Sequence, residues 1–258
     1  MLRTARRLLR RKEREAARQF LAEGRQAISE ALRQPGIVVE LLVADDSVDR
    51  HADLLGSATA LGVRVTAAPT RVVDELADTV TPQGLVAVCK TVDVAPAEAL
   101  TGSPQLVVIC DQVRDPGNLG TVIRCADAFG ADAVLVSRNS VDLYNAKTVR
   151  ATTGSLFHLP IAIDVDLAEV VTQARQAGLH VFGADATAAC TVNELAQSGE
   201  LTSPTAWVLG NEAWGLPAEH TRLLDRLVAL PRYGRAESLN LSTAAAVFLY
   251  ASATAQRA

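Results

Sequence analysis

The chain has 258 residues, of which 49% are hydrophobic and 21% are charged, and its formal net charge at pH 7 is -4. This length fits one large domain or two modest ones, and the hydrophobic fraction excludes an intrinsically disordered chain, which needs low hydrophobicity and high net charge. The acidic balance by itself argues against a strongly basic nucleic-acid binder.

The net charge of -4 is distributed unevenly along the chain. Residues 1–18 hold eight basic and two acidic side chains, so this segment carries +6 and residues 19–258 carry -10. The basic residues are Arg3, Arg6, Arg7, Arg10, Arg11, Lys12, Arg14 and Arg18. A basic amino-terminal block of this kind is either a contact for a polyanion or the solvated face of a helix. Composition leaves both interpretations open.

The first ninety residues predict a small α/β unit. Residues 5–33 are expected to be helical, because apolar side chains recur at roughly helical spacing until Pro35-Gly36. Apolar runs of β type then alternate with short helical patterns. We expect strands over 37–43, 63–67 and 84–90, and helices over 49–62 and 70–78. Residues 91–104 have two Pro and no clear period, which predicts a linker.

A second alternation of strands and helices follows the linker. The predicted strands are 105–111, 133–137, 159–163, 179–184, 205–210 and 227–231. The predicted helices are 117–130, 145–154, 167–178 and 238–255. This alternation predicts an α/β fold with a mostly parallel sheet covered by helices on both faces. Ligands of such sheets bind beyond the carboxyl ends of the strands, and three of these ends lead into unusual loops.

Several classes of site and location are disfavoured. The four Cys residues form no C-x-x-C pair and the four His residues form no pair with metal-ligand spacing, so we predict no metal site. Cys89 and Cys110 end apolar runs and are expected to be buried.

Residues 238–255 carry no charge but contain six Ser, Thr or Asn residues, which favours a buried soluble helix over a membrane span. With no signal peptide predicted, we expect a cytoplasmic protein with no membrane partner.

The first unusual loop lies in residues 110–131. Asp115-Pro116-Gly117-Asn118 joins a strand to a helix whose free N–H groups could bind an anion, and Arg124 lies further along that helix. An ordinary strand-to-helix loop with a helix cap is the alternative.

Acidic and polar residues mark the other two loops. In residues 208–217, Glu212 directly follows an apolar strand, which is costly unless the carboxylate caps a helix near Pro217 or binds something. In residues 230–250, Ser238 and Asn240 open an Ala-rich helix, and helix capping alone could explain both. None of the three loops contains G-x-G-x-x-G, G-K-[ST] or G-x-S-x-G, which argues against dinucleotide-binding, P-loop and hydrolase sites.

Taken in order, the three loops resemble a known family. DPGNLGTVIRCADAFGA, VLGNEAWGLP and LPRYGRAESLNLSTAAAV are similar to the motifs of the SpoU (TrmH-type) branch of the SPOUT RNA methyltransferases. The resemblance covers residues 105–258. It implies a SPOUT fold with a C-terminal deep trefoil knot, S-adenosylmethionine held in the knot, and a homodimer through the knotted domain. The implied reaction is methyl transfer to a ribose 2′-hydroxyl of structured RNA.

The amino-terminal segments RQFLAEGRQAISEAL and TPQGLVAV are similar to the L30e-like substrate-binding domain of the ribosomal-RNA members. The resemblance therefore implies an L30e-like domain over 1–90, a linker over 91–104 and a methyltransferase domain over 105–258. It favours 23S ribosomal RNA as substrate. The alternatives are a transfer-RNA 2′-O-methyltransferase and a non-catalytic RNA-binding or ribosome-assembly protein on the same fold.

Carried over position by position, the resemblance assigns site residues. The implied catalytic residues are Asn118, Arg124, Glu212, Ser238 and Asn240. The implied cofactor-binding residues are Leu209, Gly210, Asn211, Leu230, Pro231, Leu239 and Asn240. The predicted RNA-binding residues are Arg7, Arg10, Arg11, Arg18, Arg25, Arg114, Arg150, Arg232 and Arg235. The last two lie in RYGRAES, where many members have an apolar-Gly-polar run.

The resemblance also nominates roles. Arg124 is the residue expected to act on the 2′-hydroxyl. Because the pKa of a free Arg is about 12 or above, we expect it to orient the hydroxyl and stabilise the developing alkoxide rather than act as a neutral base. Asn118 is expected to position Arg124 or the ribose, and Glu212 to hold an Arg or Asn through charge-assisted bonds. Ser238 and Asn240 are expected to orient the phosphate and the knot.

Overall fold

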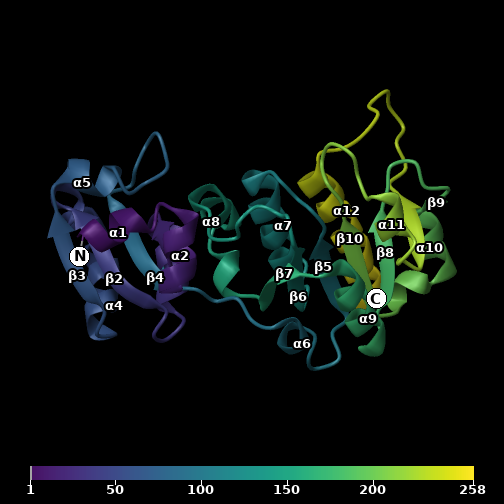
Figure 1. The fold of residues 1–258 in the computed structure, drawn as a ribbon, viewed down its shortest axis with the longest axis horizontal. Helices are drawn as coiled ribbons and strands as arrows, with labels where there is room; N and C mark the ends of the chain where they lie inside the picture. The colour runs from purple at the N-terminus through teal and green to yellow at the C-terminus, as the bar shows by residue number, and fades with distance from the viewer. Residues whose placement is uncertain (1) are drawn as a thin grey trace. The chain divides into compact units, whose positions relative to one another are not determined.

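The computed structural model describes residues 2–258, which form two compact units (Figure 1). Unit 1 comprises the residues up to Val92 together with Asp142–His158, and unit 2 comprises Asp93–Val141 and Leu159–Ala258. Met1, the first residue of the predicted amino-terminal domain, and the side chains of Leu2 and Arg3 lie outside the described part. In the predicted linker, α6 (Pro96–Ala99) forms and buries Ala99 in the core of unit 2. The domain boundaries stay a prediction.

Unit 1 is built on a four-stranded mixed sheet. Its strand order is β1 (Gln19–Glu23), β4 (Leu85–Lys90), β2 (Val38–Ala44) and β3 (Arg64–Ala68). β4 runs antiparallel to both β1 and β2, and β3 runs parallel to β2. The helices of this unit are α1 (Leu2–Arg7), α2 (Arg11–Ala17), α3 (Arg25–Leu32), α4 (Ala52–Ala60), α5 (Thr70–Asp74) and α8 (Ala146–Thr152). Short 3-10 turns cover Asp45–Ser47, Asp49–His51 and Ser155–Phe157.

The prediction of one helix over 5–33 is wrong. Arg18 takes a left-handed conformation (φ 51°) that ends α2, and Gly24 (φ 83°) separates β1 from α3. Between them, Phe20 pairs with Cys89 and Leu21 with Val88 in the ladder to β4. Four of the five residues of β1 are buried, so the strand shows no alternation of apolar and polar side chains. A strand buried on both faces lacks the period of two that distinguishes a strand from a helix.

Unit 2 contains seven parallel strands. Their order is β7 (Ile161–Val165), β6 (Ala133–Ser137), β5 (Leu106–Cys110), β10 (Thr205–Leu209), β8 (His180–Ala184), β11 (Arg226–Ala229) and β9 (Cys190–Thr191). Every residue of β5, β6 and β10 is buried, as expected of central strands in a parallel sheet covered on both faces. The predicted α/β class with a mostly parallel sheet is confirmed. The trefoil knot stays a prediction.

Helices cover both faces of this sheet (Figure 1). Side chains of α6 and α9 (Leu167–Gln176) share a core cluster with alternate sheet residues such as Val107 and Ile109. On the other face, α7 (Pro116–Ala128) and α12 (Leu241–Arg257) pack against each other and against β5. There the fully buried Trp207 lies 4.4 Å from Phe248 between ring centroids, and its indole N–H donates to Ser252 at 2.9 Å.

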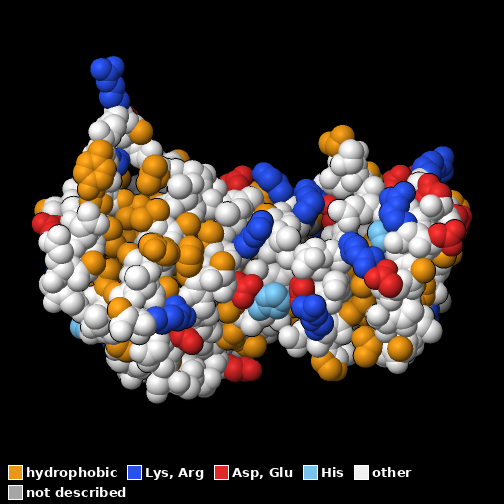
Figure 2. Space-filling model, turned by 180° about the vertical axis from the view of Figure 1, so that it is seen from behind, with side chains coloured by type: hydrophobic (Ala, Val, Ile, Leu, Met, Phe, Trp, Pro, Cys, Tyr) orange, Lys and Arg blue, Asp and Glu red, His pale blue; other side chains and the backbone are white. Residues whose placement is uncertain are grey.

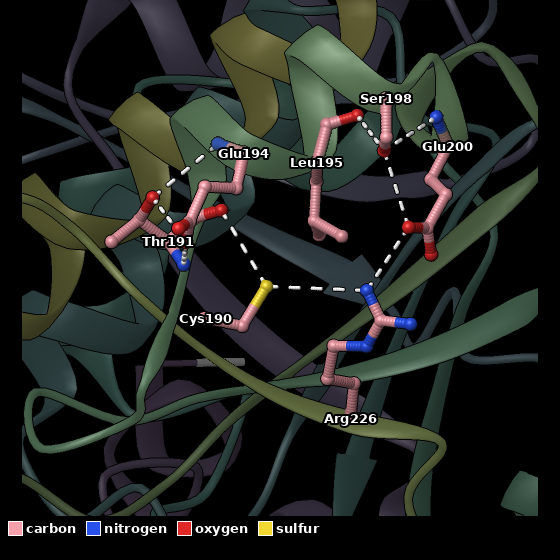
Figure 3. Close-up of polar contacts among 7 residues, drawn as sticks. All are labelled: Cys190, Thr191, Glu194, Leu195, Ser198, Glu200 and Arg226. Atoms are coloured by element: carbon pink, nitrogen blue, oxygen red, sulfur yellow. Dashed lines mark hydrogen bonds and ion pairs between the residues drawn. The ribbon is translucent and has the colours of Figure 1, made fainter.

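The far edge of the sheet holds elements that the sequence did not reveal. Thr191 begins α10 (Val192–Ser198) with a capping box, in which its hydroxyl and backbone exchange hydrogen bonds with Glu194. Figure 3 shows Arg226 of β11 reaching across this edge. Its guanidinium donates to Glu200 at 3.0 Å and lies 4.0 Å from the Cys190 sulfur. A 3-10 turn covers Glu200–Thr202, and a short α-helix, α11 (Ala218–Thr221), lies between β10 and β11. Across residues 2–258, none of the helices has the length and apolar character of a membrane span.

The reactivity of the cysteines tests whether the strand interiors are buried as described. Cys89 and Cys110 are fully buried, as predicted, and burial raises the pKa of each thiol to about 12. Because the thiolate is the nucleophile, only about one such thiol in 10⁴ would be ionised at pH 8. We expect iodoacetamide to label the partly exposed Cys190 in the native protein and to spare Cys89 and Cys110 until denaturant is added, as measured by peptide mass mapping. Rapid native labelling of Cys110 would contradict this core.

Candidate active site

A cavity of about 540 Å³ opens at the carboxyl edge of the parallel sheet in unit 2. The segments that follow β8, β10 and β11 form its walls, together with Asn118 at the start of α7 and the first turns of α12. Figure 1 shows the connection between β11 and α12 projecting beyond the strand ends. Strands β5 and β10 are neighbours in the sheet. The chain after β5 continues through α7 to β6 on one side, and the chain after β10 continues to β11 on the other side, so the strand order reverses between β5 and β10. This is the place where open α/β sheets bind ligands.

The loop after β5 begins α7 in the predicted way. Pro116 occupies the first helical turn, and the Asp115 carboxylate accepts a hydrogen bond from the backbone N–H of Asn118 at 2.7 Å. This is an N-cap, so capping explains Asp115. It does not explain the side chain of Asn118, which points to two other loops.

Glu212, in the loop after β10, binds the amino-terminal end of α7. Its carboxylate accepts hydrogen bonds from the backbone N–H groups of Arg114 and Asp115 at 3.2 and 3.3 Å, and from the Asn118 side chain at 3.1 Å. The alternative role for Glu212, capping the helix near Pro217, is wrong, because α11 begins without a side-chain cap. The carboxylate instead accepts from the backbone N–H groups of the two residues that precede α7, near the positive end of the helix dipole.

Asn240, at the start of α12, completes the connection. Its side-chain oxygen accepts from the backbone N–H groups of Ser242 and Thr243, so Asn240 is the N-cap of α12. Its amide group donates to the Asn118 oxygen at 2.9 Å. Ser238 is not the cap: it lies before the helix and lines the cavity. Glu212, Asn118 and Asn240 therefore form one network that joins the three predicted loops.

A second network, around the buried Asp111, was not predicted. Asp111, 1% exposed at the end of β5, lies 2.5 Å from Nδ1 of His220 and accepts from the Ser137 hydroxyl at 2.9 Å. A buried carboxylate needs such partners. His220 lies in α11, after the loop that contains Glu212. The Asp111–His220 contact therefore joins the start of the loop after β5 to the end of the loop after β10. No local pattern relates residues 109 positions apart, and only the strand order brings them together.

The implied cofactor-binding residues divide into two groups. Gly210, Asn211, Leu230, Leu239 and Asn240 line the cavity. Leu209 and Pro231 are not lining residues. Asn211 is 5% exposed and ties its loop to the first one by donating to the Gln112 carbonyl at 2.7 Å.

The cavity lining combines two kinds of group. Leu230, Leu239 and Phe248 offer apolar surface, whereas Asp185 and Glu212 offer carboxylates. The volume is that of a small-molecule site. This lining suits a ligand that combines an apolar part with a positive charge.

Arg124, the nominated catalytic residue, lies outside this lining. It is exposed on α7, six residues after Asn118 and hence about 9 Å further along the helix axis. The predicted RNA-binding residues Arg114, Arg232 and Arg235 lie in the loops around the cavity, and Arg232 lines it. The structure therefore gathers Asn118, Glu212, Ser238 and Asn240 around the cavity, and Arg124 is not among its lining residues.

The predicted RNA-binding residues of unit 1 are largely engaged with carboxylates. The ion pairs are Arg7–Glu13, Arg11–Glu15, Arg25–Asp53 and Arg150–Glu23. Arg14, also in the basic block, is 8% exposed and paired with Asp142. Arg10 and Arg18 are exposed. Much of the amino-terminal charge is thus balanced within unit 1.

Known proteins are similar to this chain over most of its length. The model of the SpoU rRNA Methylase family matches residues 105–250, and the model described as RNA 2'-O ribose methyltransferase substrate binding matches residues 21–94. The 23S rRNA (guanosine(2553)-2'-O)-methyltransferase RlmP of Bacillus subtilis is 36% identical, over 93% of this chain and 90% of its own. The 23S rRNA (guanosine-2'-O-)-methyltransferase RlmB of Nitrosomonas europaea is 32% identical, over 88% of each.

A solved structure is similar over nearly the whole chain. The SpoU methyltransferase AviRb of Streptomyces viridochromogenes, in complex with the cofactor AdoMet, has a TM-score of 0.84 and 30% identity. The similarity covers 99% of this chain and 98% of that one.

Gly210 provides a test of the cavity wall. A Cβ atom at this position would lie 2.6 Å from the carbonyl carbon of Gly215 and 2.8 Å from the Leu216 nitrogen, and neither backbone atom can move without opening the loop. We expect Gly210→Ala to lower the free energy of unfolding of unit 2 by about 1–3 kcal/mol, measured by chemical denaturation. Gly234→Ala is the matched control, because nothing lies within 4 Å of a Cβ there. Equal stability of the two variants would disprove the close approach.

Proposed function

Because the chain belongs to the SpoU rRNA methylase family, we propose that it transfers a methyl group from S-adenosylmethionine to a ribose 2′-oxygen of 23S ribosomal RNA. The observation that carries this proposal is the Glu212–Asn118–Asn240 network. It joins all three motif loops at one cavity, in a chain whose relatives are named for this reaction.

The cavity fits S-adenosylmethionine (AdoMet), the cofactor with which AviRb was crystallised. When bound, this cofactor supplies an electrophilic methyl group on a sulfonium ion. Leu230, Leu239 and Phe248 would pack against its apolar parts, and the carboxylates of Asp185 and Glu212 would favour its positive charge. Gly210, at the strand end, would offer backbone groups to the cofactor.

Methyl transfer in line requires the 2′-oxygen to be held in alignment and its proton to be removed. Asn118 is held by Glu212 and Asn240, so its side chain is fixed before substrate arrives. Arg124, on the same helix, would orient the 2′-hydroxyl and stabilise the alkoxide as the proton leaves to RNA phosphate or water. Ser238, at the cavity wall, would orient the phosphate.

Two alternatives are less well supported. A transfer-RNA methyltransferase would not need the amino-terminal unit, whereas residues 21–94 match a substrate-binding model and the relatives described above are named for 23S rRNA. A non-catalytic RNA-binding protein would not need the motif residues, and all of them are present. Action on ribosomal RNA also supports the cytoplasm as the location.

We further propose that the protein is a homodimer through unit 2. Figure 2 shows hydrophobic side chains gathered on one face over this unit, at the left of the view. On α12, Val247 is 42% exposed and Tyr250 is 60% exposed, beside the half-buried Ala246 and Ala251. An exposed apolar stripe on a long helix of a folded domain is typical of a protein interface.

The catalytic assignment is testable at Arg124. We expect Arg124→Ala to reduce labelled methyl transfer to deproteinised 23S rRNA by about 10²-fold or more, because the developing alkoxide loses its positive partner. The Kd for S-adenosylmethionine, measured by calorimetry, should stay the same, since Arg124 does not line the cavity. Arg124→Lys keeps the charge and should retain an intermediate rate. Wild-type turnover in Arg124→Ala would remove this residue from the mechanism, and label found only in transfer RNA would overturn the substrate.

The dimer is testable on α12. Val247→Arg places a charge within the apolar stripe and should convert the protein to a monomer, as measured by sedimentation equilibrium. Thr172→Arg on α9, which packs on the opposite face of the sheet, is the matched control and should remain a dimer. A monomeric wild-type protein would refute the proposal.

A further inference from the structure

The aromatic side chains fall into two classes. The chain has two Trp, three Tyr and five Phe. In the described part of the chain, eight of these ten rings each pack against another aromatic ring, in pairs such as Phe20–Tyr144 and Phe129–Tyr250. Trp214 and Tyr233 take part in no such ring pair there, and they are 57% and 91% exposed. Among the described residues, these two exposed rings therefore differ from Tyr250, which is also exposed but packs against Phe129.

Both rings lie at the rim of the same cavity. Ala213 and Gly215, on either side of Trp214, line the cavity, and so does Arg232, next to Tyr233. The two loops leave the carboxyl ends of β10 and β11, which both pair with β8. The rings themselves are not lining residues, so their faces are available outside the cofactor cavity.

The loops that carry the rings are anchored. Asn211 and Gly215 exchange backbone hydrogen bonds at 3.0 and 2.9 Å, which close the turn that holds Trp214. The Arg232 guanidinium donates to the carbonyls of Glu237 and Ala186, and so ties the base of the projecting loop to the chain after β8. Anchored loops hold rings at low conformational cost, which favours their use as a binding surface.

A positive charge accompanies the rings. Arg235 follows Tyr233 in the projecting loop and is exposed. Figure 2 shows a basic side chain at the tip of this loop, and the loop contains no Lys. Aromatic faces next to a guanidinium are the combination by which proteins bind unpaired nucleotides, through stacking on the base and contact with the phosphate.

We propose that Trp214 and Tyr233 form a stacking platform for unpaired bases of the RNA substrate beside the target ribose, with Arg235 on the adjoining phosphate. The inference rests on the proposed function and adds to it a class of substrate. The enzyme selects a nucleotide in a loop or bulge, because a base inside a continuous helix has no free face to stack on the rings. Trp214 and Tyr233 are therefore specificity residues rather than catalytic residues.

Fluorescence measures the platform directly. The chain has two Trp residues, and Trp207 is fully buried, so quenching by a bound base reports on Trp214. We expect an RNA hairpin with an unpaired loop to quench the full-length protein and protect it from acrylamide, and the corresponding blunt duplex to do neither. Trp214→Phe keeps a ring and removes the signal, which identifies its source. Binding of the hairpin without quenching, or equal quenching by the duplex, would overturn the platform.

Kinetics separate recognition from chemistry. Trp214→Ala and Tyr233→Ala should each raise the KM for 23S rRNA about tenfold, and the double variant about 100-fold. Saturating kcat and the Kd for S-adenosylmethionine should remain unchanged, and Trp214→Phe and Tyr233→Phe should restore KM. Val80→Ala, at a side chain 98% exposed in unit 1, is the control for loss of exposed apolar surface. An unchanged KM in the double variant would refute the proposal.

Two further outcomes distinguish the inference from its premise. If the wild type methylates 23S rRNA but the alanine variants behave as the wild type does, the platform fails and the proposed function stands. If hairpin RNA quenches Trp214 but no methyl group is transferred to any RNA, the proposed function fails and the platform stands. Dissociation of the dimer in the double variant, with RNA affinity unchanged, would show that the rings cover a second copy of the chain and would overturn the platform.

Discussion

The candidate active site depends on one electrostatic contact, the binding of the Glu212 carboxylate at the amino-terminal end of α7. The first N–H groups of a helix have no partners within it, and the helix dipole makes them an anion site. Glu212 accepts from the N–H groups of Arg114 and Asp115, immediately before α7, and in doing so brings the chain after β10 close to the start of this helix. Asn118 then has one side-chain partner on each side, Glu212 and Asn240, so the three loops are positioned together rather than one by one. The parallel pairing of β5 with β10 makes this contact possible, because it places both carboxyl ends at one edge of the sheet.

Sequence patterns predicted the parts of the fold that local physics determines. The apolar runs of β5, β6 and β10 predicted buried parallel strands, and the polar residues at their ends predicted the site. The prediction of a helix over 5–33 was wrong because β1 is buried on both faces and has no period of its own. β9 and α10 were missed because a two-residue edge strand carries too little pattern to be recognised. The signal for α10 was present in the Thr191 and Glu194 capping box, three residues apart.

Contacts between distant residues could not be predicted from patterns. The Asp111–His220 pair depends on strand order and the Trp207–Ser252 hydrogen bond depends on the packing of α12 against β10, and no single segment encodes either. The basic amino-terminal block combines one such distant contact with local ones. Its net charge of +6 suggested a polyanion contact or a solvated helix, yet in the fold Arg14 is buried against Asp142, and Arg7 and Arg11 are paired with nearby glutamates. Ala5 and Leu8 of α1 and the turn after it are buried in the core of unit 1, so the block also has a structural role that charge counting does not reveal.

This balance of charge bears on how the RNA is selected. A protein with a formal charge of -4, much of whose Arg is paired internally, lacks the broad positive field that gives strong non-specific binding to nucleic acid. Contacts at the cavity rim must then supply a larger share of the affinity. Stacking on an aromatic face is short-ranged, depends little on salt and requires an unpaired base, so it adds affinity only where the nucleotide is already accessible. A weak electrostatic field combined with exposed rings therefore favours discrimination by RNA structure over capture of any RNA, which suits an enzyme that must find one ribose among many.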